Sequence, residues 1–208
     1  MKLTKRLLIL CVAAILVCSM LVLSSCGLFR SDVENAIYDL RDATTVTMTS
    51  GNYVYKIDLE NYMAYYKYTP DSDNPFGKES ENYIYKAEDG KFYMASKSEN
   101  TIRKQEISKN EFVSYFSSVS SFTSEFDGFL KMIDFFTEED GKFTLTETED
   151  GETATVSFYV DDDGNLVGSE TYSADGETET ESRIFSAINE TEVVIPEDIK
   201  TAEAEALE

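Results

Sequence analysis

The 208-residue sequence contains no histidine and no tryptophan, and it has only three cysteines and three prolines. Without histidine the chain cannot form a Ser-His-Asp triad, a Cys-His dyad or a histidine-ligated zinc site. It also lacks the G-x-S-x-G and Walker motifs, and no carboxylate pair is framed by other candidate site residues. We therefore expect a protein that is not an enzyme, with no catalytic residue, no metal site and no cofactor.

The first residues have the layout of an export signal. Lys2, Lys5 and Arg6 precede an apolar run from Leu7 to Leu23 that only Ser19 interrupts. The run falls short of the roughly 18 apolar residues that indicate a transmembrane helix. A cleaved signal is therefore favoured, and an uncleaved membrane anchor is the alternative. Either arrangement exports the rest of the chain.

The segment Leu23-Ser24-Ser25-Cys26 resembles the lipobox of bacterial lipoproteins. This resemblance implies that Cys26 is linked to a diacylglycerol and that signal peptidase II cuts between Ser25 and Cys26. A thiol suits that alkylation because its pKa lies far below that of a serine hydroxyl. The expected location is the extracytoplasmic face of the cell membrane, with a Gram-positive surface favoured over a periplasmic leaflet.

Cleavage at Cys26 determines the composition of the mature chain. Cys11 and Cys18 leave with residues 1–25, so one cysteine remains and an internal disulfide is excluded. The signal also removes three of the 18 basic residues and none of the 40 acidic ones, which leaves 15 against 40. So acidic a chain repels phosphate groups, which argues against nucleic acid as a partner. Solubility is the simplest role of this charge, and attraction of divalent cations is the alternative.

The mature chain is expected to fold as one domain, residues 26–200, followed by an acidic tail, residues 201–208, that frays. A capping box at Ser31 and Glu34 predicts a helix over Asp32–Arg41. From Thr44 to Ile107 an alternating pattern predicts a meander of about six strands, interrupted by a longer loop from Thr69 to Ser80. Strands are again expected at Ala154–Val160, Leu166–Ser173, Thr178–Ile188 and Glu192–Ile195.

Asp-Gly pairs separate many of these elements, and they predict primed hairpin turns between antiparallel neighbours. The pairs are Asp89-Gly90, Asp140-Gly141, Asp150-Gly151, Asp163-Gly164 and Asp175-Gly176.

Two aromatic-rich helices are expected between the two strand regions. A second capping box at Ser108 and Glu111 opens the first, where Phe112, Val113, Phe116 and Val119 recur at helical spacing. The second lies within "FTSEFDGFLKMIDFF". This order of elements predicts an α+β fold in which a curved antiparallel sheet of about 11 strands, a half-barrel, wraps around a few short helices.

With its lipobox, opening helix, central helices and terminal "FSAINETEVVIPEDI", the chain resembles the half-barrel superfamily of LolA and LolB lipoprotein carriers and mycobacterial LppX-type lipoproteins. The resemblance implies a cavity for acyl chains between sheet and helices. Apolar side chains of one strand and of the second central helix would then face each other as ligand-binding residues: Tyr53, Tyr55, Ile57, Phe126, Phe129, Leu130, Ile133 and Phe136. The alternative is that these side chains form a dry, close-packed core.

Two further motifs resemble functional sites but do not indicate a function here. Asp161, Asp163 and Asn165 alternate as in a calcium loop, but Leu166 and Tyr172 occupy positions where an EF-hand needs glycine and glutamate. A hairpin turn explains these residues better. Asn189 begins a glycosylation sequon, which should have no meaning on a bacterial lipoprotein.

Two function classes remain open at this point. One is a membrane-anchored protein that binds or carries a lipid, acyl chain or other hydrophobic ligand. The other is a surface lipoprotein that contacts envelope proteins, for assembly or sensing, and has a filled core.

Overall fold

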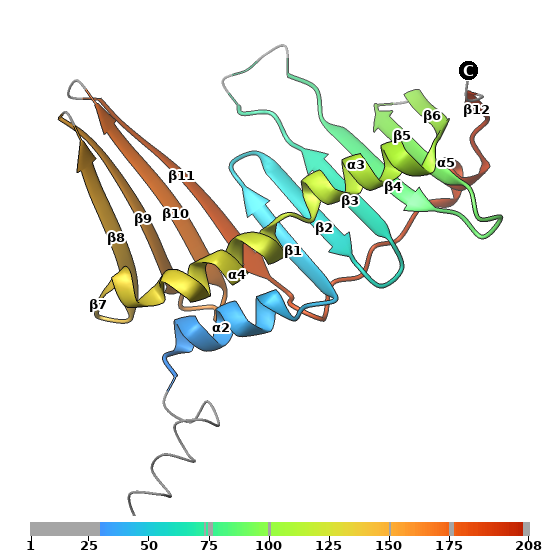
Figure 1. Ribbon diagram of the computed structural model, residues 1–208. Coiled ribbons are helices and arrows are strands. Elements are labelled where there is room, and N and C mark those ends of the chain that lie inside the picture. Colours follow the sequence, from blue (N-terminus) through green and yellow to red (C-terminus); the bar gives the residue numbers. More distant parts are fainter. Residues whose placement is uncertain are drawn as a thin grey trace, which may run out of the picture.

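The computed structural model describes residues 30–72, 74, 77–99, 101–149, 151–174 and 177–205. The expected lipidation and cleavage residues, Ser25 and Cys26, lie outside these ranges. Within them the chain has a mostly-sheet α+β fold, in which one open sheet of twelve strands is accompanied by four short α-helices (Figure 1). The predicted α+β class is confirmed.

The first half of the sheet is the predicted six-strand meander. Each strand pairs antiparallel with the next. The strands are β1 Thr45–Ser50, β2 Tyr53–Asp58, β3 Met63–Tyr68, β4 Ser80–Lys86, β5 Phe92–Ser98 and β6 Thr101–Ile107.

The second half is a meander of five strands, also antiparallel. These strands are β7 Thr137–Glu139, β8 Lys142–Glu149, β9 Glu152–Val160, β10 Leu166–Ala174 and β11 Glu177–Ser186. The two meanders meet where β11 pairs antiparallel with β1. The strand order is therefore β12-β6-β5-β4-β3-β2-β1-β11-β10-β9-β8-β7, with the first and last long strands side by side at the centre.

Only part of the turn prediction is correct. Asp140 and Gly141 join β7 to β8 as a two-residue loop, and both have positive φ, 50° and 75°, as a type I′ turn requires. At Asp89-Gly90 and Asp163-Gly164 the prediction of a primed turn is wrong. There the five residues 87–91 and 161–165 separate the strands, and the glycine N–H donates to the carbonyl three residues earlier. Asp150, Asp175 and Gly176 lie outside the described residues.

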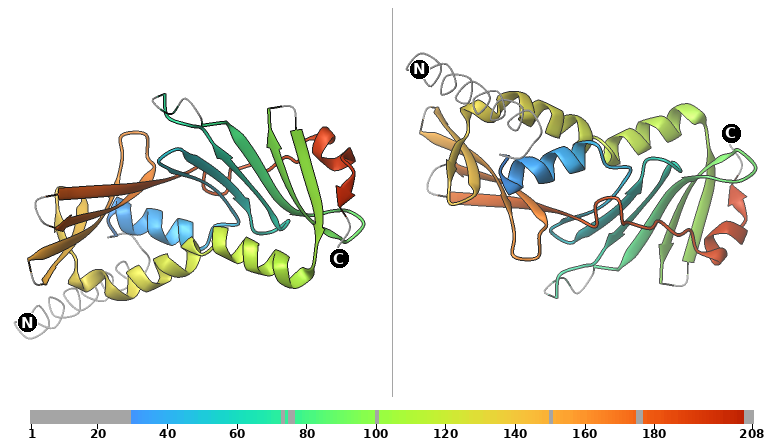
Figure 2. Two further views of the ribbon diagram at one scale, coloured as in Figure 1. Left: turned by 90° about the horizontal axis from the view of Figure 1, so that it is seen from above. Right: turned by 90° about the horizontal axis from the view of Figure 1, so that it is seen from below.

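Three helices lie along one face of the sheet, as the two views of Figure 2 show. The first, α2 (Asp32–Arg41), has the predicted bounds and the predicted capping box. The chain then leaves β6 through α3 (Lys109–Val119) and α4 (Phe122–Met132), followed by the short 3₁₀-helix η1 (Ile133–Phe135). These helices carry the chain from one edge of the sheet to the other, where β7 begins.

The space between these helices and the sheet is the larger hydrophobic core. It joins residues from both halves of the sheet to residues of all three helices. Its buried members are Val33, Ile37, Leu40, Val46, Ile57, Ala64, Ile84, Ile107, Phe112, Phe116, Phe126, Phe129, Phe143, Leu166 and Phe185.

The opposite face of β3–β6 is covered by the end of the chain. Val193, Ile195 and Ile199 pack there against the strand residues Tyr83 and Tyr85. Residues 191–196 are not a strand, so the prediction of a strand over Glu192–Ile195 is wrong. Their alternating burial comes from lying across the sheet instead of pairing within it. The helix α5 (Glu197–Thr201) follows, and β12 (Ala204–Glu205) pairs parallel with β6, within the segment expected to fray.

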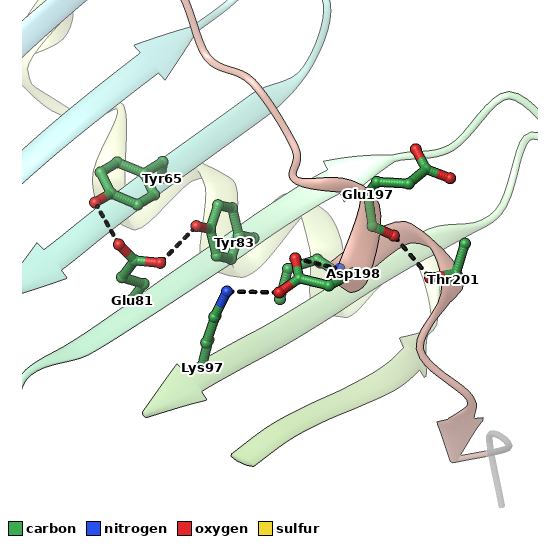
Figure 3. Close-up of polar contacts among 8 residues, drawn as sticks. Tyr65, Glu81, Tyr83, Lys97, Glu197, Asp198 and Thr201 are labelled. Carbon is green, nitrogen blue, oxygen red and sulfur yellow. Dashed lines mark hydrogen bonds and ion pairs between the residues drawn. The ribbon is translucent and has the colours of Figure 1, made fainter. Parts of the chain in front are cut away.

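Polar contacts hold this final segment in place (Figure 3). The Lys97 ammonium forms an ion pair with Asp198 at 2.5 Å. The buried Lys104 ammonium donates to the Lys200 carbonyl at 2.7 Å and lies 4.5 Å from the Tyr93 ring centre. Nearby, Glu81 accepts hydrogen bonds from the hydroxyls of Tyr65 and Tyr83.

Candidate functional site

The helices leave part of their own face of the sheet uncovered. In Figure 1 the strands β8–β11 extend well beyond α4, and the outer ends of β1–β3 also pass the helices. Large or charged side chains are exposed there, including Tyr53, Glu170, Tyr172 and Glu181. We call this surface the open face. It comprises Ser50, Tyr53, Tyr55, Tyr66, Tyr68, Ala154, Val156, Phe158, Gly168, Glu170, Tyr172, Glu179, Glu181 and Arg183.

Four tyrosines of β2 and β3 form one end of the open face, which we call the tyrosine platform. The ring centres of Tyr53 and Tyr68 are 5.0 Å apart, and those of Tyr55 and Tyr66 are 5.8 Å apart. Tyr53 also stacks on Tyr55 at 6.0 Å. Burial raises the pKa of the Tyr55 and Tyr66 hydroxyls, so both stay neutral at physiological pH. The platform offers flat aromatic surface and neutral hydroxyl groups.

Strand register connects the platform to β10. Tyr53 lies opposite both Tyr68 and Ser50, Ser50 lies opposite Arg183, and Arg183 lies opposite Gly168. Directly opposed residues of antiparallel strands have side chains on the same face. One row of side chains therefore crosses the sheet from the aromatic end to β10, with the Arg183 guanidinium between them.

A small cavity, here called the inner cavity, lies beside this row and under α4. Its volume is about 60 Å³, and Phe126, Phe158 and Phe185 supply apolar walls. Gly168 also lines the cavity, and a Cβ atom at this position would lie 3.0 Å from the Phe158 ring. The absence of a side chain at Gly168 is what lets the Phe158 ring lie against β10.

A larger hollow, here called the tip groove, continues outward along β9, β10 and β11. Its volume is about 610 Å³, within the range of roughly 300–1,000 Å³ typical of ligand pockets. Val156, Glu170 and Glu181 line both the tip groove and the inner cavity, so the two spaces adjoin. The outer part of the groove is lined by Ala154, Tyr172 and Glu179. The inner cavity, with its phenylalanine walls, thus adjoins the tip groove, which carries three glutamates.

The residues predicted to bind ligand are divided between this surface and the core. Tyr53 and Tyr55 belong to the tyrosine platform, and Phe126 borders the inner cavity. Ile57 and Phe129 are buried in the larger core. Leu130, Ile133 and Phe136 pack against that core as partly buried residues.

The two predicted sets are not in ring contact with each other among the described residues. The rings of α4 instead pack on the sheet: Phe126 lies 5.1 Å from Phe185, and Phe129 lies 4.4 Å from Phe158. These side chains therefore occupy part of the space in which an acyl chain was expected, and the inner cavity lies beside them.

Sequence reasoning missed several residues of the open face. The alternation of Ala64, Tyr66 and Tyr68 was a usable signal, because it puts both tyrosines on the face of a buried alanine. Glu170, Glu181 and Gly168 gave no such signal, since their proximity depends on the register between β10 and β11.

The remaining polar motifs have structural roles. The Asp161 carboxylate accepts hydrogen bonds from the backbone N–H groups of Asp163 and Asn165, as expected for a hairpin turn. The Asn189 side-chain oxygen accepts from the Thr44 N–H at 2.8 Å. In the part of the chain that the structure describes, no group of three acidic or cysteine side chains could hold a metal ion. Over the same residues, none of the helices has the length and apolar character needed to span a membrane.

Comparison with known proteins gives no match of any of the three kinds sought: no protein-family description, no curated protein and no solved structure is significantly similar to this chain. The resemblance to lipoprotein carriers therefore depends on the sequence features alone.

Proposed function

We propose that this protein is a non-enzymatic, lipid-anchored lipoprotein of the extracytoplasmic membrane surface that acts by binding another protein through its open face. The observation that carries this proposal is the contrast between the two parts of the helix-side surface. Beneath the helices large apolar side chains pack into one core around the small inner cavity, whereas the open face presents clustered tyrosines and a groove of about 610 Å³. Tyrosine is enriched at protein interfaces because it combines apolar area with a polar group.

The test is site-specific photo-crosslinking in the native host. A photoreactive phenylalanine analogue is placed at Tyr53 or Tyr172 of the open face, which are 40% and 47% exposed. The matched control is Tyr115 on α3, which is 43% exposed. We expect a discrete protein adduct from the two open-face positions and none from Tyr115. The absence of open-face adducts, or equal adducts from all three positions, would reject the proposal.

The anchor has its own test. Cys26→Ser should abolish lipidation, because a serine hydroxyl is a far weaker nucleophile than a thiol near neutral pH. The variant should accumulate as an unprocessed precursor without the mass of a diacylglycerol. A variant that is processed at position 26 and partitions into detergent like the parent would contradict the anchor.

A second candidate function is carriage of a lipid or acyl chain in a half-barrel, as the lipoprotein-carrier resemblance implies. The inner cavity beneath α4 is the observation in its favour. At about 60 Å³ it cannot enclose a long chain, so this function requires α4 to separate from β9 and β11. Lipid extraction and native mass spectrometry of protein purified from its own host distinguish the two functions. Stoichiometric lipid would favour the carrier, and its absence would favour protein contacts.

A further inference from the structure

We propose that the partner contributes a basic peptide segment, whose aliphatic side chain enters the inner cavity while its flanking Lys or Arg residues lie in the tip groove. This inference builds on the proposed function, since it names the chemistry that the open face recognises. It depends on three properties of the two adjoining hollows: size, charge and the order in which the lining groups occur.

Size limits what can enter the inner cavity. A cavity of about 150 Å³ binds benzene, so the inner cavity, at about 60 Å³, is too small for an aromatic ring. It can accept the end of one aliphatic side chain, such as leucine, against Phe126, Phe158 and Phe185. The rest of the ligand must lie in the tip groove. A ligand with one small apolar group on a mainly polar body fits this division, and a long-chain lipid does not.

Charge determines what can lie in the tip groove. Glu170 and Glu181 are directly opposed on β10 and β11, and Glu179 lies two residues from Glu181. Like charges in directly opposed positions repel each other and destabilise the strand pair. Arg183, on the same face, brings one positive charge against the three carboxylates, so the groove keeps an excess of negative charge that attracts a ligand cation. The complementary ligand group is therefore an ammonium or guanidinium.

The overall charge excludes other occupants. The chain carries a formal net charge of −22, so a second copy would bring its own carboxylates against those of the groove. An anionic lipid surface is repelled for the same reason. A basic segment of another protein is attracted, and its association should weaken as salt is added.

The order of the lining groups orients the ligand. Phe126, Phe158 and Phe185 line the inner cavity and not the tip groove, whereas Tyr172 and Glu179 line only the tip groove. The aliphatic side chain and the basic side chains must therefore occupy opposite ends of the site, in the order inner cavity and then groove.

The experiment measures fluorescence anisotropy of a labelled nonapeptide with a central leucine flanked by lysines and glycines. The full mature chain is compared with E170Q/E181Q and with the control E190Q/E192Q. The control removes the same charge from exposed residues outside both hollows. We expect E170Q/E181Q to bind about tenfold more weakly, a loss of roughly 1.4 kcal/mol. The control should bind like the parent, and replacing the peptide's leucine by serine should also weaken binding.

Several outcomes would overturn this inference. These are undetectable binding of the leucine peptide, equal loss in both double variants, or indifference to the leucine-to-serine change. Circular dichroism and melting curves verify that all variants are folded, and relief of the Glu170–Glu181 repulsion should not lower their stability. The photo-crosslinking experiment separates the two proposals. If adducts at Tyr53 and Tyr172 persist while the peptide fails, only the basic-peptide inference is rejected.

Discussion

At the scale of single residues, the aromatic side chains divide into two kinds of environment. Phe126 and Phe129 are buried and pack edge-to-face on rings of β9 and β11. The four tyrosines of the tyrosine platform lie partly exposed on the open face. Both groups read alike in the sequence, as large aromatics at regular spacing. Their division depends on how far the helices extend over the sheet, which no local pattern encodes.

The first prediction concerns Phe129. Its ring is 5% exposed and lies 4.7 Å from Phe136 and 4.4 Å from Phe158. Phe129→Ala should therefore lower the free energy of unfolding by about 3–5 kcal/mol, as expected for a packed phenylalanine. The matched control is Phe135→Ala, whose ring is 73% exposed and which should change stability by less than about 0.5 kcal/mol. Urea denaturation measures both, and similar losses for the two variants would contradict a filled core.

The second prediction concerns alkaline pH. Burial, together with the Glu81 carboxylate, raises the pKa of Tyr65 from 10.0 to about 12. The unfolded chain then releases this proton at lower pH than the folded chain. Its contribution to stability is fully present below about pH 10 and is lost as pH rises toward 12.

Tyr65→Phe removes this titration, so the fall in the urea midpoint between about pH 10 and 12 should become shallower. Tyr115→Phe on the surface of α3 serves as the control and should leave the profile unchanged. If Tyr65→Phe has the same pH profile as the parent, then Tyr65 does not contribute to alkaline unfolding.

At the scale of elements, the starts of α2 and α3 were the most predictable features. Ser31 with Glu34, and Ser108 with Glu111, satisfy free backbone N–H groups within four consecutive residues, so the signal is entirely local. The error at Glu192–Ile195 shows the opposite case. Val193 and Ile195 are buried and Glu192 and Val194 are exposed, as in a strand, yet no strand pairs with them. Alternating apolar and polar residues indicate that one side of an extended chain is buried. They do not indicate that the chain forms backbone hydrogen bonds with a neighbouring strand.

The third prediction concerns the cap of α3. The Ser108 hydroxyl accepts from the Glu111 N–H, and the Glu111 carboxylate accepts from the Ser108 N–H at 2.8 Å. Ser108→Ala should lower the free energy of unfolding by about 1 kcal/mol. Ser114→Ala, at an exposed position inside the same helix, should leave stability unchanged or raise it slightly, because alanine has the highest helix propensity. Equal effects of the two changes in urea denaturation would show that the cap is not needed.

At the scale of the whole molecule, the α+β class, the first meander and the strands β9–β11 could be predicted, but the pairing that joins the two meanders into one open sheet could not. Hairpins connect strands that are near in sequence, and turn residues such as Asp-Gly predict them. The pairing of β1 with β11 joins Thr47 to Ser186 and Ser50 to Arg183, and it depends on the path of α3 and α4 across the face. That pairing places the tyrosine platform and the tip groove on one continuous sheet, so the open face was not predictable in detail.

The fourth prediction concerns cooperativity. The larger core contains Val46 from the first meander together with Leu166 and Phe185 from the second. Because one core unites both halves, the protein should unfold in a single two-state transition with a circular dichroism spectrum dominated by strand. Far-ultraviolet circular dichroism and tyrosine fluorescence should give coincident urea curves. Two separated transitions would mean that the halves are independent.

The central position of β11 also has a consequence for how the molecule is assembled. A chain that emerges from the ribosome, or from an export channel, exposes its N-terminal part first. The meander β1–β6 can then form while the outer edge of β1 has no neighbour, because its partner is the last long strand to be made. An open sheet edge exposes unpaired backbone N–H and C=O groups, which can pair with other chains. The protein therefore passes its most aggregation-prone stage just before completion, and residues 177–186 end that stage by inserting between β1 and β10.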